Sequence, residues 1–161
     1  GLGWGLLGAA PMVLLFLGLS QLPLGPLQQI SKFTDEVIYP LLEPCTLVDL
    51  LGIPLLAGLG EEMLFRGVLQ GAFARYLPGL VALGLASVLF GVLHAVTLTY
   101  ALLATLMGVW LGLLWIWTDN LLVPAVTHAA YDFVLLLWLL RGPGRPAEAS
   151  ADEVAAPEQP D

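Results

Sequence analysis

The longest uncharged stretch of this chain, residues 76–118, contains no Asp, Glu, Lys or Arg. A membrane-spanning helix needs about 20 apolar residues, so the stretch is long enough for two helices with a tight reversal near Thr97–Thr99. The bilayer core holds no water to bind backbone amides, and a spanning segment must satisfy its hydrogen bonds internally. The stretch therefore predicts helices rather than open strands.

Three further apolar stretches, residues 2–19, 46–76 and 121–140, predict three more membrane helices. Residues 27–38 alternate apolar and charged side chains at helical spacing, which predicts an interfacial amphipathic helix, with a structured loop as the alternative. The predicted fold is an all-α polytopic transmembrane bundle of about five membrane helices plus this interfacial helix. Only 11% of the residues are charged, which also indicates an integral membrane protein.

We divide the chain into four parts. Residues 1–20 form the first transmembrane helix, and residues 21–45 a polar connection that contains the interfacial helix. Residues 46–140 form a catalytic core, and residues 141–161 an Ala/Pro-rich tail with too little apolar surface to fold. The tail holds five of the thirteen acidic residues, so the net charge of −8 is concentrated there, and nothing basic enough to bind nucleic acid remains.

The ends of the predicted spans indicate a location and an orientation. No basic residues precede the first apolar segment, so we interpret it as a true span rather than a signal peptide. Lys32, Arg141 and Arg145 fall on one side of the bilayer and Arg75 on the other, which predicts a cytoplasmic C-terminal tail. We expect the membrane to be the plasma membrane. The single cysteine, Cys45, excludes a disulfide within one chain and is interpreted as a packing residue.

Glu61, Glu62 and Arg66 stand inside the apolar second span. Charged side chains at bilayer depth cost at least a few kcal/mol, so they face the protein interior and usually mark function. On a helix, Glu62 and Arg66 are four residues apart, in the favourable orientation for an ion pair. Glu61 is then free to act as a general base on water. The alternative is that all three residues form one buried salt-bridge network.

Two histidines have similarly apolar surroundings. His94 follows Phe90 by one turn, and Asp132 follows His128 by one turn, so that the carboxylate can orient the His128 ring. A structural histidine is the alternative for His94. Glu61, His94, His128 and Asp132 are also candidate ligands for a divalent metal such as Zn²⁺, although the zinc-protease pattern His-Glu-x-x-His is absent from the sequence.

These residues resemble the three motifs of the CAAX-protease and bacteriocin-processing (CPBP or Abi) family of intramembrane proteases. The Glu-Glu-x-x-x-Arg, Phe-x-x-x-His and His-x-x-x-Asn/Asp motifs match at Glu61-Glu62…Arg66, Phe90…His94 and His128…Asp132, and the resemblance covers residues 46–140. It implies an endopeptidase that acts on a peptide or protein substrate at the lipid bilayer. Glu61 would activate water and His94 would position it. His128 and Asp132 would stabilise the oxyanion, and Glu62 and Arg66 would brace the site.

The resemblance leaves alternatives open. We expect that the protein needs no metal cofactor. The alternative is that it binds a divalent metal ion. A non-catalytic scaffold or bacteriocin-immunity protein would retain the same fold. A proton or ion pathway would also bury carboxylates and histidines, but it should have more polar lining than Thr105 alone in residues 101–117.

The depths of the motifs yield a geometric prediction. At about 1.5 Å per helical residue, His128 lies about 12 Å shallower than Glu61 and His94 if every helix stands upright. A shared site therefore predicts a recessed, protein-covered turn at residues 118–123. Glu61, His94 and His128 should converge on one cavity, which opens towards the face that carries the C-terminus.

Overall fold

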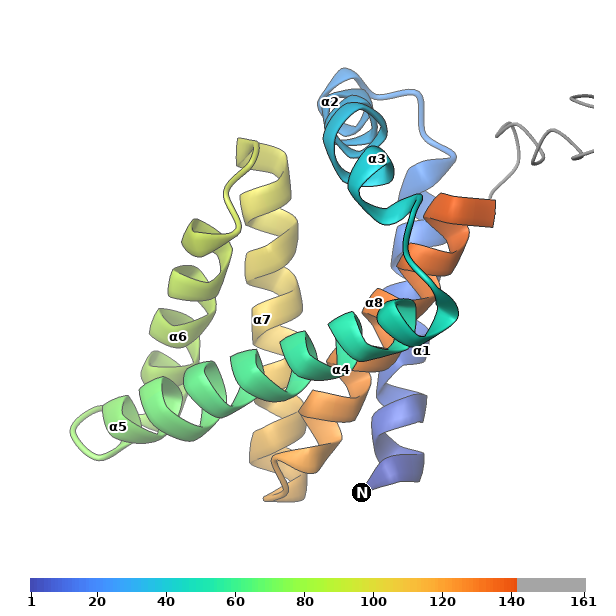
Figure 1. Ribbon diagram of the computed structural model, residues 1–161. Helices are drawn as coiled ribbons and strands as arrows, with labels where there is room; N and C mark the ends of the chain where they lie inside the picture. The colour runs from blue at the N-terminus through green and yellow to red at the C-terminus, as the bar shows by residue number, and fades with distance from the viewer. Residues whose placement is uncertain (142–161) are drawn as a thin grey trace, which may run out of the picture.

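The computed structural model describes residues 1–141, which form helices joined by short loops and contain no strand (Figure 1). The elements are α1 (Leu2–Ser20), α2 (Gly25–Phe33), the π-helix η1 (Thr34–Ile38), α3 (Tyr39–Leu42), α4 (Leu47–Glu62), the π-helix η2 (Met63–Gln70), α5 (Gly71–Ala74), α6 (Gly79–Leu93), α7 (Leu98–Thr118) and α8 (Leu122–Arg141). The predicted all-α class is confirmed. The predicted tail lies outside the described residues, apart from Arg141.

Three helices are long and apolar enough to cross a membrane: α1, α7 and α8. A fourth span is obtained if the pair Gly25–Leu42 and Leu47–Ala74, bent by 118°, counts as one. The helical membrane bundle is thus confirmed with three to four candidate spans, where the sequence predicted about five. Helix α6, which the sequence predicted as a span, is not among these candidates. It has 15 residues and is about 22 Å long, which is shorter than the roughly 30 Å hydrocarbon core.

The helix that carries the glutamates crosses the bundle obliquely (Figure 1). Helix α8 packs against α1 and α4, and α6 packs against α7. At the crossing of α4 and α8, a Cβ atom on Gly58 would lie 2.8 Å from the backbone oxygen of Ala125 and 2.9 Å from the backbone nitrogen of Ala129. Glycine lets the two backbones approach closely here, as small residues do between membrane helices. This contact brings the Glu61–Glu62 pair next to α8.

The predicted recessed turn after α7 is wrong. Asp119 and Asn120 are exposed, and the turn lies at the same end of the bundle as the N-terminus (Figure 1). The prediction assumed upright helices, whereas the oblique path of α4 brings the glutamates to the depth of His128. The turn instead reverses the chain through Asp119, whose φ of 47° is left-handed, a conformation that Asp tolerates better than most residues.

Residues 25–42 form helix rather than loop and lie at the end of the bundle where α1 and α8 also end (Figure 1). Helix α2 begins with Pro26 in its first turn, where the missing amide hydrogen of proline is tolerated. None of the α2 residues is buried. The predicted helix is therefore confirmed, while its interfacial placement stays a prediction.

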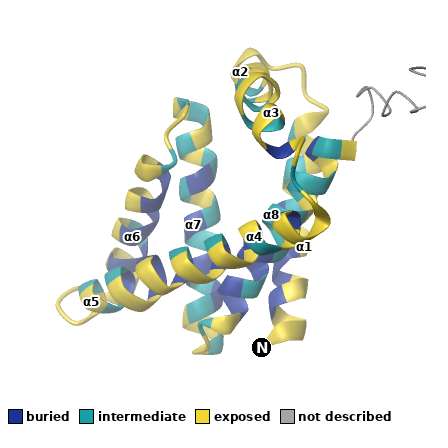
Figure 2. Cartoon of the chain, in the orientation of Figure 1, coloured by how far each residue is buried: buried dark blue, intermediate teal, exposed yellow. Residues whose placement is uncertain are grey.

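Exposed positions cover much of the outer helix surfaces (Figure 2), and many of them are large apolar residues, whereas several polar or charged side chains are buried. Exposed residues include many leucines of α1, α4 and α6, whereas the buried polar or charged set is Glu62, Arg66, Gln70, Ser87, Thr127 and His128. Water would penalise such an apolar surface, and lipid would not. Together with the three spans, this distribution identifies a membrane protein.

Candidate active site

The two glutamates lie at the junction of α4 and η2. Thr46 begins α4 with a capping box, since its hydroxyl accepts the Asp49 amide hydrogen and its own amide donates to the Asp49 carboxylate. The helix continues through Pro54 and becomes π-helical at Met63, directly after Glu62. Such π-helical insertions in a longer helix occur frequently at functional sites.

Glu62 is fully buried and has two cationic or polar partners. Its Oε1 atom accepts a hydrogen bond of 2.7 Å from Nη1 of Arg66 and lies 3.0 Å from Nδ1 of His128. Arg66 also donates from Nη2 to the carbonyl oxygen of Gly108, at 2.9 Å. The predicted Glu62–Arg66 ion pair is therefore present, and it connects η2 with α7 and α8.

His128 lies between two carboxylates. Its Nδ1 faces Glu62, and its Nε2 is 3.4 Å from Oδ2 of Asp132, one turn further along α8. Only an imidazolium donates hydrogen from both ring nitrogens. Arg66 and a charged His128 would balance the charges of Glu62 and Asp132, so that this buried cluster is neutral as a whole.

Glu61 and His94 form a second, more open pair. Oε2 of Glu61 is 3.5 Å from Nε2 of His94, and the side chains are 33% and 28% exposed respectively. Nδ1 of His94 is 2.8 Å from the carbonyl oxygen of Phe90. A carbonyl only accepts, so Nδ1 carries hydrogen and Nε2 of the neutral ring is an acceptor. Two acceptors thus face each other, and a molecule that donates to both would satisfy them.

Phe90 joins the two clusters. Its ring stacks on the His94 ring, with centroids 4.3 Å apart, and meets the His128 ring edge-on at 5.9 Å. The Arg66 guanidinium lies 5.0 Å from the centroid of the same ring, within the range of a cation–π contact. Sequence reasoning identified Phe90 only as a motif position, and the contacts indicate that it fixes the distance between the two histidines.

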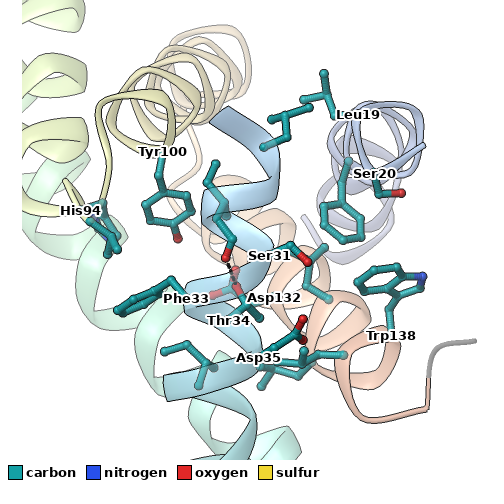
Figure 3. A pocket seen from close by; sticks show the side chains of 18 of the residues that line it. Leu19, Ser20, Ser31, Phe33, Thr34, Asp35, His94, Tyr100, Asp132 and Trp138 are labelled. Carbon is teal, nitrogen blue, oxygen red and sulfur yellow. Dashed lines mark hydrogen bonds between the residues drawn. The ribbon is translucent and has the colours of Figure 1, made fainter. Parts of the chain in front are cut away.

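One cavity of about 360 Å³ contains the predicted catalytic set, since Glu61, His94, His128 and Asp132 all line it. The predicted convergence on one cavity is confirmed, whereas Glu62 and Arg66 lie behind it. A larger groove of about 1250 Å³ shares His94 and Asp132 with the cavity and extends under α2 and η1 (Figure 3). Its lining includes the ends of α1 and α8, and the predicted opening of the cavity towards this face stays a prediction.

Two tyrosines line both the cavity and the groove: Tyr100 in the first turn of α7 and Tyr131 in α8. The sequence analysis assigned no role at the site to either residue. The position of Tyr131 directly before Asp132 was the available signal.

The candidate metal ligands are divided between the two clusters. Across residues 1–141, no three His, Cys, Asp or Glu side chains are arranged to hold a metal ion. Glu61 pairs with His94, and both ring nitrogens of His128 face carboxylates. In this arrangement the four predicted ligands do not form a coordination set.

The matches with known proteins fall on the same segment as this site. A family model described as "Type II CAAX prenyl endopeptidase Rce1-like" matches residues 43–134. "Uncharacterized protein YpbD" of Bacillus subtilis (strain 168) is 40% identical over 85 residues, which are 51% of this chain and 41% of that protein. The chain therefore matches about two fifths of the length of this relative.

No solved structure matches the chain. The family match extends from the last residues before α4 to the middle of α8, and it includes both carboxylate–histidine clusters and Phe90. The chain belongs to the Rce1-like family of type II CAAX prenyl endopeptidases.

Proposed function

We propose that this chain is an intramembrane endopeptidase that hydrolyses a peptide bond with water activated by Glu61. The observation that carries the proposal is the contrast between the two adjacent glutamates. Glu62 is committed to Arg66 and His128, whereas Glu61 faces the cavity beside the acceptor nitrogen of His94. Of the two carboxylates, only Glu61 is placed to receive a proton from a molecule in the cavity.

In the proposed reaction a water molecule bridges the Glu61–His94 pair, in which Oε2 of Glu61 is buried and has no hydrogen-bond partner. Oε2 of Glu61 and Nε2 of His94 are 3.5 Å apart. The water oxygen would lie to one side of the line between them, about 2.8 Å from each acceptor. Both hydrogens would then point at the protein, and the oxygen lone pairs at the cavity. This is the orientation that a nucleophilic water needs.

The proposed reaction has two steps. The water oxygen attacks the scissile carbonyl carbon, Glu61 takes one water proton, and the carbonyl electron pair moves to the oxygen. The tetrahedral intermediate then collapses, the C–N bond breaks, and the leaving nitrogen takes the proton from Glu61. His128 supports the oxyanion with its positive charge, Asp132 and Glu62 orient the His128 ring, and Arg66 holds Glu62.

The substrate that we propose is a peptide or protein whose scissile bond reaches the cavity through the groove under α2 and η1. A C-terminal CAAX peptide with a prenyl group is the substrate class that the family description indicates. The C-terminal face of the protein, towards which the groove would open, lies in this proposal on the cytoplasmic side of the plasma membrane.

The test is comparative cleavage profiling of a membrane proteome incubated with wild type or with Glu61→Ala. New peptide termini should appear with the wild type and be absent with the variant. A farnesylated CAAX peptide, with a fluorophore and a quencher on either side of the scissile bond, serves as a defined probe. Identical terminus profiles for the two proteins, with no cleavage of the probe, would exclude the protease assignment.

A further inference from the structure

The cavity needs a hydrogen-bond donor for the oxyanion, and most of its side-chain donors are already engaged. Nδ1 of His94 donates to the Phe90 carbonyl oxygen, and Nε1 of Trp110 donates to the Gly8 carbonyl oxygen at 2.9 Å. The two ring nitrogens of His128 face carboxylates. The remaining side-chain donors in the cavity lining are the hydroxyls of Tyr100 and Tyr131.

Tyr100 is the better placed of the two tyrosines. It lies six residues after His94, the partner of Glu61, across the short loop between α6 and α7, whereas Tyr131 directly precedes Asp132 on α8. Thr97 caps α7 by accepting the Tyr100 amide hydrogen at 3.1 Å, and this contact fixes the backbone that carries the ring. Figure 3 shows the Tyr100 ring beside His94, with its hydroxyl directed into the groove that adjoins the cavity.

We propose that the Tyr100 hydroxyl is a catalytic hydrogen-bond donor to the scissile carbonyl oxygen, an inference that rests on the proposed function. The hydroxyl keeps its proton throughout. It donates to the neutral carbonyl in the bound substrate, and more strongly to the oxyanion that forms when water attacks the carbon. His128, whose two ring nitrogens face carboxylates, then contributes charge from the cavity wall, while Tyr100 donates the hydrogen bond.

The test is Tyr100→Phe in the full chain, with Tyr76→Phe as the matched control and Tyr131→Phe as the competing donor, assayed on the farnesylated fluorogenic CAAX peptide. Loss of one oxyanion donor typically lowers kcat by about 100-fold to 1000-fold. We expect a loss of about 100-fold in kcat for Tyr100→Phe, with KM and the melting temperature close to those of the wild type. Tyr76→Phe should retain kcat within about threefold, because Tyr76 is 86% exposed and lines neither the cavity nor the groove.

The outcomes separate this inference from the proposed function. If wild type cleaves the peptide, Glu61→Gln does not, and Tyr100→Phe matches wild type, the inference is wrong and the function stands. If Tyr131→Phe carries the loss instead, the inference is also overturned. Wild type that cleaves neither the probe nor any membrane protein rejects the function, and the inference with it.

A second variant keeps the hydroxyl and the fold. Site-specific 3,5-difluorotyrosine at position 100 is a stronger acid than tyrosine, and its ionised form cannot donate. Its kcat should therefore decline at a lower pH than that of the wild type. The groups that face it (Glu61, His94, Tyr131 and Asp132) are unchanged in this variant. An unshifted pH profile of kcat would contradict the proposed donor.

Discussion

Substitution of Gly58 by alanine should separate the two helices that assemble the site. The added Cβ would lie 2.8 Å from the Ala125 oxygen and 2.9 Å from the Ala129 nitrogen, both backbone atoms of α8. Ordinary contact begins at 3.4 Å, so α4 must move away by about 0.5 Å. Rotation of a side chain cannot relieve a clash with backbone.

The shift acts on the hydrogen bond between Glu62 and His128. Their 3.0 Å separation would approach 3.5 Å, where such a bond is largely lost. Overpacking typically costs about 1–3 kcal/mol, so Gly58→Ala should lower the melting temperature. A misplacement of about 1 Å can cost about 100-fold in rate, and half of that distance should reduce kcat about tenfold.

Gly60→Ala is the matched control, because the same change two residues along α4 meets nothing within 4 Å. Alanine has a helix propensity about 1 kcal/mol more favourable than glycine, so this variant should be at least as stable as the wild type and fully active. Both variants would be compared by thermal melting in detergent and by kcat on the fluorogenic peptide. Equal stability and activity of the two variants would refute the close-contact argument.

Two further predictions concern the buried cluster and the cofactor. Glu62→Gln should reduce the free energy of unfolding by about 3–5 kcal/mol, because it leaves Arg66 and His128 without their shared carboxylate; a melting temperature equal to that of Glu61→Gln would contradict this. Treatment with a strong chelator should leave cleavage intact, and elemental analysis should find well under one equivalent of zinc. A stoichiometric ion whose removal abolishes activity would reverse that expectation.

Much of the local geometry could be predicted from the sequence. The Glu62–Arg66 pair follows from helical spacing alone, and the His128–Asp132 contact follows from the same rule on α8. The oblique path of α4 could not be predicted in this way, because it depends on the contact of Gly58 with a helix about 70 residues away in the sequence. The depth argument failed for that reason, and with it the recessed turn.

The contribution of the tyrosines was missed for a different reason. A neutral aromatic residue at the end of an apolar stretch is typical of the membrane–water boundary, and Tyr100 fits that pattern in the sequence. Its position at the cavity depends on the packing of α7 against α6, which places His94 and Tyr100 on opposite sides of one short loop. The sequence pattern of α7 alone does not show that Tyr100 lies at the cavity.

The measurement that tests the central claim most directly is the kcat of Glu61→Gln, with its melting temperature recorded alongside. The amide keeps the shape of the side chain but cannot accept a proton from water. General-base catalysis typically contributes about 100-fold to 10,000-fold, so kcat should fall at least about 100-fold while the melting temperature stays close to that of the wild type. Cleavage within about threefold of the wild-type rate would show that Glu61 is not the base.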